Sequence, residues 1–145
     1  MFLGKYHTTI DSQNHLAPPS RQTDLFSEVA FLTQGFDKNL MMLTDEAFRG
    51  ILAHIKTLNI ADPITRLLLR LFLGNTVEVQ ADKAGQFFIP DHLKDFAGLT
   101  DEVLLIGQGD YFEIWSPESW MKQEQRIQDA EANANRFSVL NIATR

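Results

Sequence analysis

The sequence predicts an α+β protein in which eight short strands form one interleaved, pseudo-twofold β-barrel with flanking helices. One observation behind this prediction is an internal duplication: residues 10–19 resemble residues 81–90, and residues 40–48 resemble residues 112–120. An internal repeat of this kind restricts the possible folds before single residues are considered. A second observation is size, because each half has only about 45 to 50 ordered residues, which is marginal for a separate core. We therefore expect the two halves to fold around one shared core.

The first copy begins with a β-hairpin and continues with two apolar strands. A half-polar strand is expected over residues 5–10, and residues 15–17 return beside it. The intervening residues 11–14 favour a turn, because Asp and Asn side chains bond their own backbone and Asn tolerates a left-handed conformation. Short apolar runs over residues 29–33 and 40–43 predict two more strands, joined by a loop that contains glycine.

The second copy repeats this order with clearer patterns. Residues 76–81 alternate polar and apolar side chains with period two, residues 82–85 form the turn, and residues 86–89 return. Apolar strands are then expected over residues 102–106 and 111–115. The second copy therefore contributes the other four strands of the predicted eight.

A helix is expected after the last strand of each copy. Thr44 and Ser116 are suitable N-cap residues, and Pro117 occupies a first helical position, where proline costs no hydrogen bond. Between the copies, residues 64–73 predict a helix that is apolar nearly all round, which must be covered by a core or by another subunit. A short helix is expected over residues 90–98. The polar tail after the last helix is expected to protrude or fray.

Composition narrows the classes of function. The chain has 145 residues, 44% of them hydrophobic and 22% charged, with a formal net charge of -6 and no cysteine. These values are typical of globular proteins, and they exclude disulfides and cysteine-based zinc sites. The acidic balance disfavours general nucleic-acid affinity but is compatible with a local basic face repeated by assembly. No apolar run approaches the roughly 20 residues of a membrane span, and no basic apolar leader is present, so the expected location is the cytoplasm.

Catalytic and metal-binding patterns are missing from the sequence. The four histidines show no paired ligand spacing, and no nucleophile elbow or Walker-type loop occurs. The glycines at 107 and 109 precede a strand rather than a helix, which disfavours a phosphate cradle. Trp115 and Trp120 are interpreted as core residues. We therefore expect no enzymatic activity, no metal and no cofactor.

Several segments resemble the MraZ family, whose half-modules are similar to AbrB-type regulators. The most distinctive is Gly107-Gln108-Gly109-Asp110-Tyr111-Phe112-Glu113-Ile114-Trp115-Ser116-Pro117-Glu118-Ser119-Trp120. Further resemblance lies in Pro90 to Leu99, in the start Met1-Phe2 with Gly4 and Ile10-Asp11, and in Asp62-Pro63 with Arg66 and Arg70. The resemblance covers the chain up to a tail that starts at Arg126.

The resemblance implies two tandem SpoVT-AbrB modules with swapped hairpins, at residues 5–47 and 76–119. A helical linker would span residues 48–75, and a C-terminal helix and tail would span residues 120–145. It further implies a nucleoid-associated bacterial transcriptional regulator of the division and cell-wall gene cluster. Such regulators form homo-oligomeric rings that present their turns to tandem promoter repeats in double-stranded DNA.

The chain departs from the family where the family's turns carry an arginine that is taken to contact DNA. His15 and Gln86 occupy these two positions. A histidine is mostly neutral at pH 7, whereas Gln86 can pair with adenine without supplying charge. The candidate DNA-binding residues are Lys5, His7, His15, Arg21, Lys83 and Gln86. The candidate turn-structuring residues are Asp11, Asn14, Asp82 and Gly85.

Other interpretations of these residues remain open. His15 and Gln86 could be solvated turn residues, and each turn aspartate is better explained by capping of its own hairpin than by a DNA contact. Arg66 and Arg70 favour an inter-subunit ion pair or solvation over DNA. The missing arginines also allow an alternative function, an oligomeric scaffold or interaction protein that has lost strong DNA binding.

Overall fold

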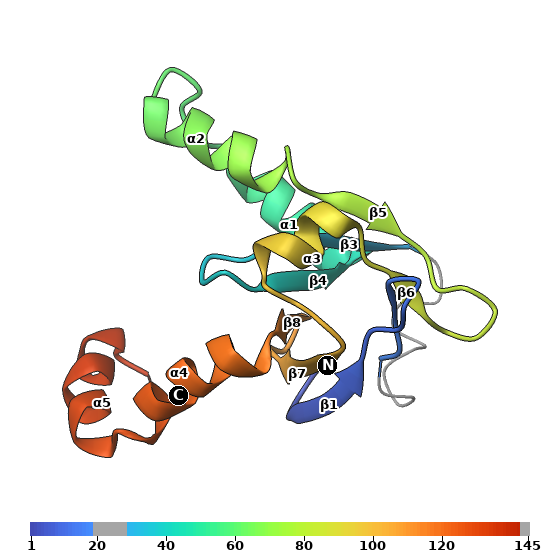
Figure 1. The fold of residues 1–145 in the computed structure, drawn as a ribbon. Helices are drawn as coiled ribbons and strands as arrows, with labels where there is room; N and C mark the ends of the chain where they lie inside the picture. Colours follow the sequence, from blue (N-terminus) through green and yellow to red (C-terminus); the bar gives the residue numbers. More distant parts are fainter. Residues whose placement is uncertain (19–28, 143–145) are drawn as a thin grey trace.

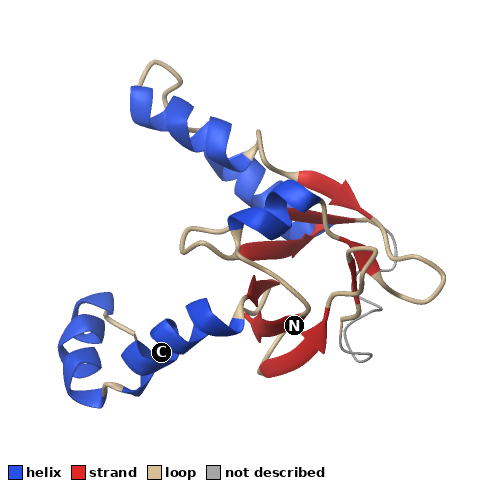
Figure 2. Cartoon of the chain, in the orientation of Figure 1, coloured by secondary structure: helices blue, strands red, loops and turns tan. Residues whose placement is uncertain are grey.

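The computed structural model describes residues 1–18 and 29–142, so the candidate Arg21 lies outside the described residues. The described part is a mixed α+β structure with two antiparallel sheets (Figures 1 and 2). The strands of the first half are β1 (Lys5–Thr9), β2 (His15–Leu16), β3 (Ala30–Gln34) and β4 (Leu40–Thr44). Those of the second half are β5 (Val77–Val79), β6 (Phe87–Phe88), β7 (Glu102–Gly107) and β8 (Tyr111–Trp115). Every strand overlaps a predicted one, and no strand end differs from its predicted position by more than two residues.

The two halves exchange their hairpins. In the six-stranded sheet the order is β1-β7-β8-β4-β3-β5, so the first strand of each half pairs with the third strand of the other half. The centre of this sheet is the pair β4–β8, and the smaller sheet joins β2 to β6. The strand order is unchanged when the halves are interchanged, as a duplicated sequence would require. Among the described strands no pairing joins β1 to β5, so the closed barrel stays a prediction.

The main core draws side chains from both halves, as the size of each half predicts. Leu16 and Leu32 of the first half and Phe87 and Ile114 of the second half are all fully buried in it. Each such side chain contributes about 1.5 to 3 kcal/mol when it leaves water. Because neither half could bury these residues alone, the hairpin exchange and the shared core stabilise each other.

Helices follow the sheets much as predicted. The helices are α1 (Asp45–Ile55), α2 (Pro63–Phe72), α3 (Asp91–Phe96), α4 (Pro117–Gln128) and α5 (Ala130–Phe137), followed by the 3₁₀ turn η2 (Ser138–Leu140). Thr44 caps α1 by accepting the Ala47 N–H at 3.1 Å, and Ser116 caps α4 by accepting the Ser119 N–H at 3.1 Å. The tail extends away from the sheets (Figure 1). It is helical rather than frayed, and Asp129 caps α5 by accepting the Ala132 N–H.

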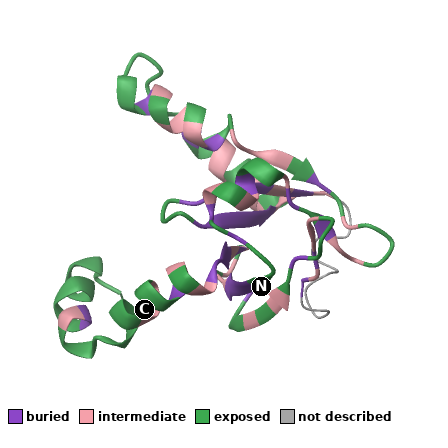
Figure 3. Cartoon of the chain, in the orientation of Figure 1, coloured by how far each residue is buried: buried purple, intermediate pink, exposed green. Residues whose placement is uncertain are grey.

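Within the chain, α2 is covered on one side, and cover of its other side by another subunit stays a prediction. The apolar pattern predicts a helix covered on several sides, but Ile64 is 74% exposed and Leu67 is 64% exposed. Only the side that carries Leu69 and Phe72 packs against α1 and the sheet. Figure 3 shows exposed residues along the projecting part of α2. The remaining apolar side of this helix has no cover from the described residues.

Candidate nucleic-acid interface

The first turn, residues 11–15, is closed by four hydrogen bonds that centre on Asp11. Its carboxylate Oδ1 accepts the backbone N–H groups of Gln13 and His15, each at 2.9 Å. The Asp11 N–H donates to the His15 carbonyl at 3.0 Å, and the Asn14 N–H donates to the Asp11 carbonyl at 3.1 Å. Asn14 has φ 63°, the left-handed conformation that asparagine tolerates. The side chain of Asp11 therefore holds the backbone of this turn.

The second turn, residues 82–86, has the same four hydrogen bonds. The Asp82 Oδ1 accepts the N–H groups of Ala84 and Gln86, each at 2.9 Å. The Asp82 N–H donates to the Gln86 carbonyl, and the Gly85 N–H donates to the Asp82 carbonyl, both at 2.9 Å. Gly85 has φ 78° at the position that Asn14 occupies in the first turn. The duplicated sequence therefore gives two turns of one geometry.

The carboxylate of Asp11 is electrostatically adapted to this role. The backbone N–H of His15, followed by the N–H of Gln13, stabilises the charged form and holds the pKa of Asp11 below its usual value. The His15 ring contributes in the same direction, with Nδ1 3.6 Å from Asp11 Oδ1. Asp11 consequently stays ionised and facing its own turn, where it adds negative charge to the surface.

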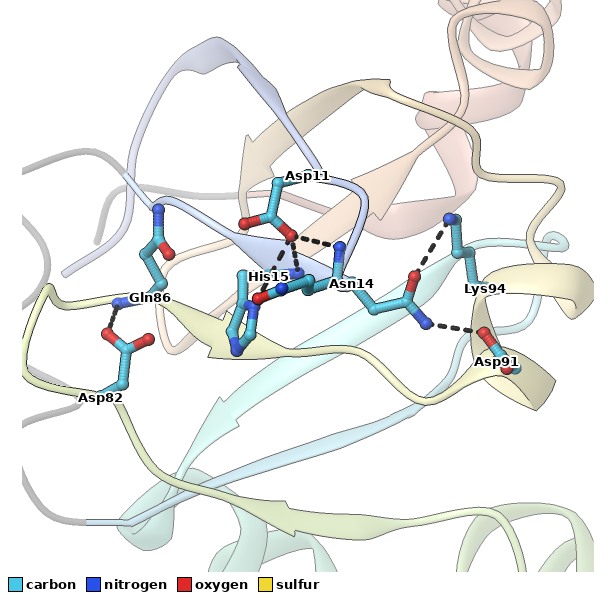
Figure 4. Close-up of polar contacts among 8 residues, drawn as sticks. Asp11, Asn14, His15, Asp82, Gln86, Asp91 and Lys94 are labelled. Carbon is cyan, nitrogen blue, oxygen red and sulfur yellow. Dashed lines mark hydrogen bonds and ion pairs between the residues drawn. The ribbon is translucent and has the colours of Figure 1, made fainter.

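The β2–β6 ribbon joins the two turns. His15 pairs with Phe88, and Leu16 pairs with Phe87. Both Leu16 and Phe87 are fully buried, so their neighbours in these strands face outward, because successive side chains alternate between faces. The strands are antiparallel, so the turns lie at opposite ends of the ribbon (Figure 4).

The ribbon and its end carry the two residues that stand where the family resemblance implies arginines. Phe88 lies opposite His15, with ring centroids 6.1 Å apart, and is 50% exposed. Gln86 lies just before β6 at the end of the ribbon, and its side chain points to the opposite side from the His15 ring (Figure 4). We call His15 and Phe88, together with the adjacent Gln86, the ribbon face.

The first turn is also tied to the second half of the chain. The Asn14 side chain donates to Asp91 Oδ1 at 2.6 Å and accepts from Lys94 Nζ at 3.2 Å (Figure 4). The Ile89 N–H donates to the Asn14 carbonyl at 2.8 Å. Asn14 thus links the tip of the first turn to α3.

The surface around the ribbon face carries more negative charge than we expect of a DNA interface. Asp11, Asp82 and Asp91 contribute three carboxylates, against the lysines Lys83 and Lys94. Lys94 is already engaged with Asn14. Lys83 is exposed at the second turn and has no ion pair among the described residues. Lys83 is therefore the described lysine of the turns that is best placed to meet a phosphate.

Two other candidate residues lie on β1 away from the ribbon face. Lys5 and His7 alternate with partly buried side chains and are exposed. Lys5 begins the strand, at the end opposite the turn, where its Nζ lies 3.9 Å from Glu124 Oε1 and 5.6 Å from the Trp120 ring centroid. The structure therefore brings Lys5 to α4, while His15, Lys83 and Gln86 gather at the ribbon and its turns.

Phe88 and Lys94 are parts of this region that sequence reasoning missed. The signal for Phe88 was present, because strict alternation in residues 86–89 places it outward if Phe87 faces the core. The contact of Lys94 with Asn14 joins residues far apart in the chain, and no local pattern indicates it.

Among the described residues no group of histidine, aspartate and glutamate side chains could hold a metal ion. No described helix is both long and apolar enough to cross a bilayer.

Comparison with known proteins gives consistent results. Residues 72–140 match a family model described as "MraZ protein, putative antitoxin-like". A relative from Roseiflexus castenholzii is 35% identical over 138 residues, which cover 95% of this chain and 94% of the relative. One from Herpetosiphon aurantiacus is 34% identical over 143 residues, which cover 98% of this chain and 100% of the relative. One from Thermomicrobium roseum is 33% identical over 127 residues, which cover 88% of this chain and 89% of the relative. Each of the three is named a transcriptional regulator, MraZ.

Proposed function

The chain belongs to the MraZ family of transcriptional regulators, and on this premise we propose that it is a sequence-specific DNA-binding regulator. Its DNA is the tandem repeat array in the promoter of the division and cell-wall gene cluster. The protein acts there as a ring-shaped homo-oligomer, in the cytoplasm and associated with the nucleoid. Each chain presents the ribbon face and the two turns as its reading surface.

The observation that carries this proposal is the equivalence of the two turns. Asp11 and Asp82 impose the same hydrogen-bonded backbone at the two ends of one short ribbon. A two-stranded ribbon has a width that the major groove of DNA admits. Two equivalent reading points on one chain, multiplied by assembly, suit a DNA site that is itself repeated.

The ribbon face offers chemistry for reading bases. Gln86 can bond adenine bidentately through its amide, and Phe88 can contact a thymine methyl group. Lys83 supplies a cation for a neighbouring phosphate. Each family arginine that is absent would have contributed about 1 to 3 kcal/mol at a base contact. Binding by one chain is therefore weak, and the assembled protein depends on simultaneous engagement of several turns.

An electrophoretic mobility shift with the promoter repeats upstream of the protein's own gene tests this proposal. The assembled protein is expected to retard the repeats at low salt and to leave a shuffled duplex of the same composition free. A matched variant, Lys83→Glu with Gln86→Glu, keeps the turn backbone and reverses the charge at its tip. Failure of the assembled wild-type protein to retard the repeats would sink the proposal.

A second candidate function is favoured by the acidic surroundings of the ribbon face. With Asp11, Asp82 and Asp91 exposed and both arginines replaced, the chain would serve as an oligomeric scaffold or interaction protein. The double variant His15→Arg with Gln86→Arg is the reference for this test. Both functions predict tighter binding by this variant, so the wild type decides: if the assembled wild type retards the repeats specifically, even at a higher concentration than the variant requires, the scaffold function is excluded.

A further inference from the structure

An exposed apolar stripe runs along α2. Ile64 and Leu67 are 74% and 64% exposed, and Ile60 just before the helix is 69% exposed. Leu71 is partly exposed one helical turn beyond Leu67, so Ile64, Leu67 and Leu71 lie on one side of the helix by their spacing. Arg70 borders the stripe, is exposed and forms no ion pair among the described residues. The stripe is therefore an exposed apolar surface flanked by a cation.

A separate hollow lies where α1, the N-terminus and the β7–β8 loop meet. Its volume is about 670 Å³, within the range of about 300 to 1,000 Å³ that is typical of ligand sites. Phe2, Leu43, Ile51 and Tyr111 are among its lining residues. The size and the apolar lining suit several aliphatic side chains at once.

The rim of the hollow complements the flank of the stripe in charge. Glu46 and Asp110 both line the hollow, and neither forms an ion pair among the described residues. Gly50 lines the same hollow from α1, and a Cβ built on it would meet nothing within 4 Å. The hollow is therefore open on the Gly50 side, with carboxylates available for a guanidinium such as that of Arg70.

We propose that the α2 stripe of one chain docks into the hollow of a second copy of this chain. The stripe and the hollow are different surfaces, so the contact is head to tail. In a pair of chains, one hollow and one stripe therefore remain free to bind further copies. A repeated head-to-tail contact closes into a ring when its rotation permits. This inference rests on the self-assembly in the proposed function and names the surfaces that perform it.

Two single variants address the two surfaces, and the readout is molar mass by light scattering after size-exclusion chromatography. Gly50→Trp fills the hollow, and its matched control Gly50→Ala adds one methyl group and favours the helix. Leu67→Glu places a charge on the stripe at an exposed position. We expect wild type and Gly50→Ala to be oligomers and the two disruptive variants to be monomers with unchanged circular dichroism.

Mixing the two disruptive variants gives the decisive result. The Gly50→Trp chain keeps an intact stripe, and the Leu67→Glu chain keeps an intact hollow. An equimolar mixture should therefore form a one-to-one heterodimer and nothing larger.

Four results would overturn the inference: a monomeric wild type, a mixture that stays monomeric, or either disruptive variant alone remaining oligomeric. An oligomeric Gly50→Trp protein would indicate a symmetric contact between stripes. An oligomeric Leu67→Glu protein would indicate that another segment fills the hollow. A wild-type oligomer that assembles through these surfaces yet binds no promoter DNA would leave this inference standing and defeat the proposed function.

Discussion

The two turns share one backbone and differ in what surrounds them. In the first turn, Asn14 carries the left-handed position and reaches Asp91 and Lys94 of the other half. In the second turn, Gly85 takes the same conformation without a side chain, and Lys83 stands exposed beside it. The duplication therefore preserves the hydrogen bonds that a turn requires and lets the tip residues diverge. The first turn is anchored to α3 by Asn14, whereas Lys83 at the tip of the second turn is exposed.

The largest expected effect comes from restoring the arginines. His15→Arg with Gln86→Arg adds two bidentate donors at about 1 to 3 kcal/mol each, so the lower figure alone predicts about 25-fold tighter binding. The slope of log affinity against log salt should steepen by about 0.9 for each added phosphate contact. Titrations at several salt concentrations measure both quantities. The single variants sharpen the comparison of the turns, because Gln86→Arg lies beside the free Lys83 and is expected to gain more than His15→Arg.

Exchanging the left-handed residues tests the anchoring of the first turn. Asn14→Gly keeps the backbone conformation but removes two side-chain hydrogen bonds, which predicts a loss of about 1 to 2 kcal/mol in the free energy of unfolding. Gly85→Asn places a tolerated residue in the second turn and should be nearly neutral. Urea denaturation of both variants measures the difference. Equal losses would mean that the two turns are anchored alike.

The pH dependence of stability examines the aspartate of the first turn. The pKa of Asp11 is lowered in the folded chain, so its contribution to stability is present above the unfolded value near 3.8 and is lost as pH falls through the lower folded value. Wild type should therefore be more stable than Asp11→Asn at neutral pH, and the gap should narrow below about pH 4. Thermal unfolding from pH 7 to pH 2 measures this gap. A gap that is constant over that range would show that the charge of Asp11 contributes nothing.

Local chemistry predicted much of this structure. The Asp-led segments gave both turns because their hydrogen bonds lie within five residues, and Thr44 and Ser116 gave the helix starts for the same reason. The helix in the C-terminal tail was not predicted, although Asp129 before an alanine-containing segment is a recognisable helix start. The duplication and the size of each half predicted an interleaved fold, but the hairpin exchange itself was implied only by the family resemblance, because strand pattern alone does not specify a distant partner.

Contacts between distant elements account for what the sequence could not place. Lys5 is near the first turn in sequence, but an extended strand carries it to α4, where Trp120 and Glu124 lie close by. The apolar pattern of α2 correctly indicated a helix that requires cover, yet it did not indicate that the chain leaves Ile64 and Leu67 exposed. Whether such a side is covered by the same chain or another depends on tertiary and quaternary arrangement.

The central claim is that this chain reads promoter DNA through its two turns, and sequencing of the DNA bound to it in cells tests that claim most directly. Tagged wild-type protein is compared with the variant Lys83→Glu with Gln86→Glu at equal expression. We expect wild type to enrich tandem repeats upstream of its own gene and the variant to lose that enrichment. Equal recovery of the repeats with both proteins, or recovery with neither, would contradict the claim.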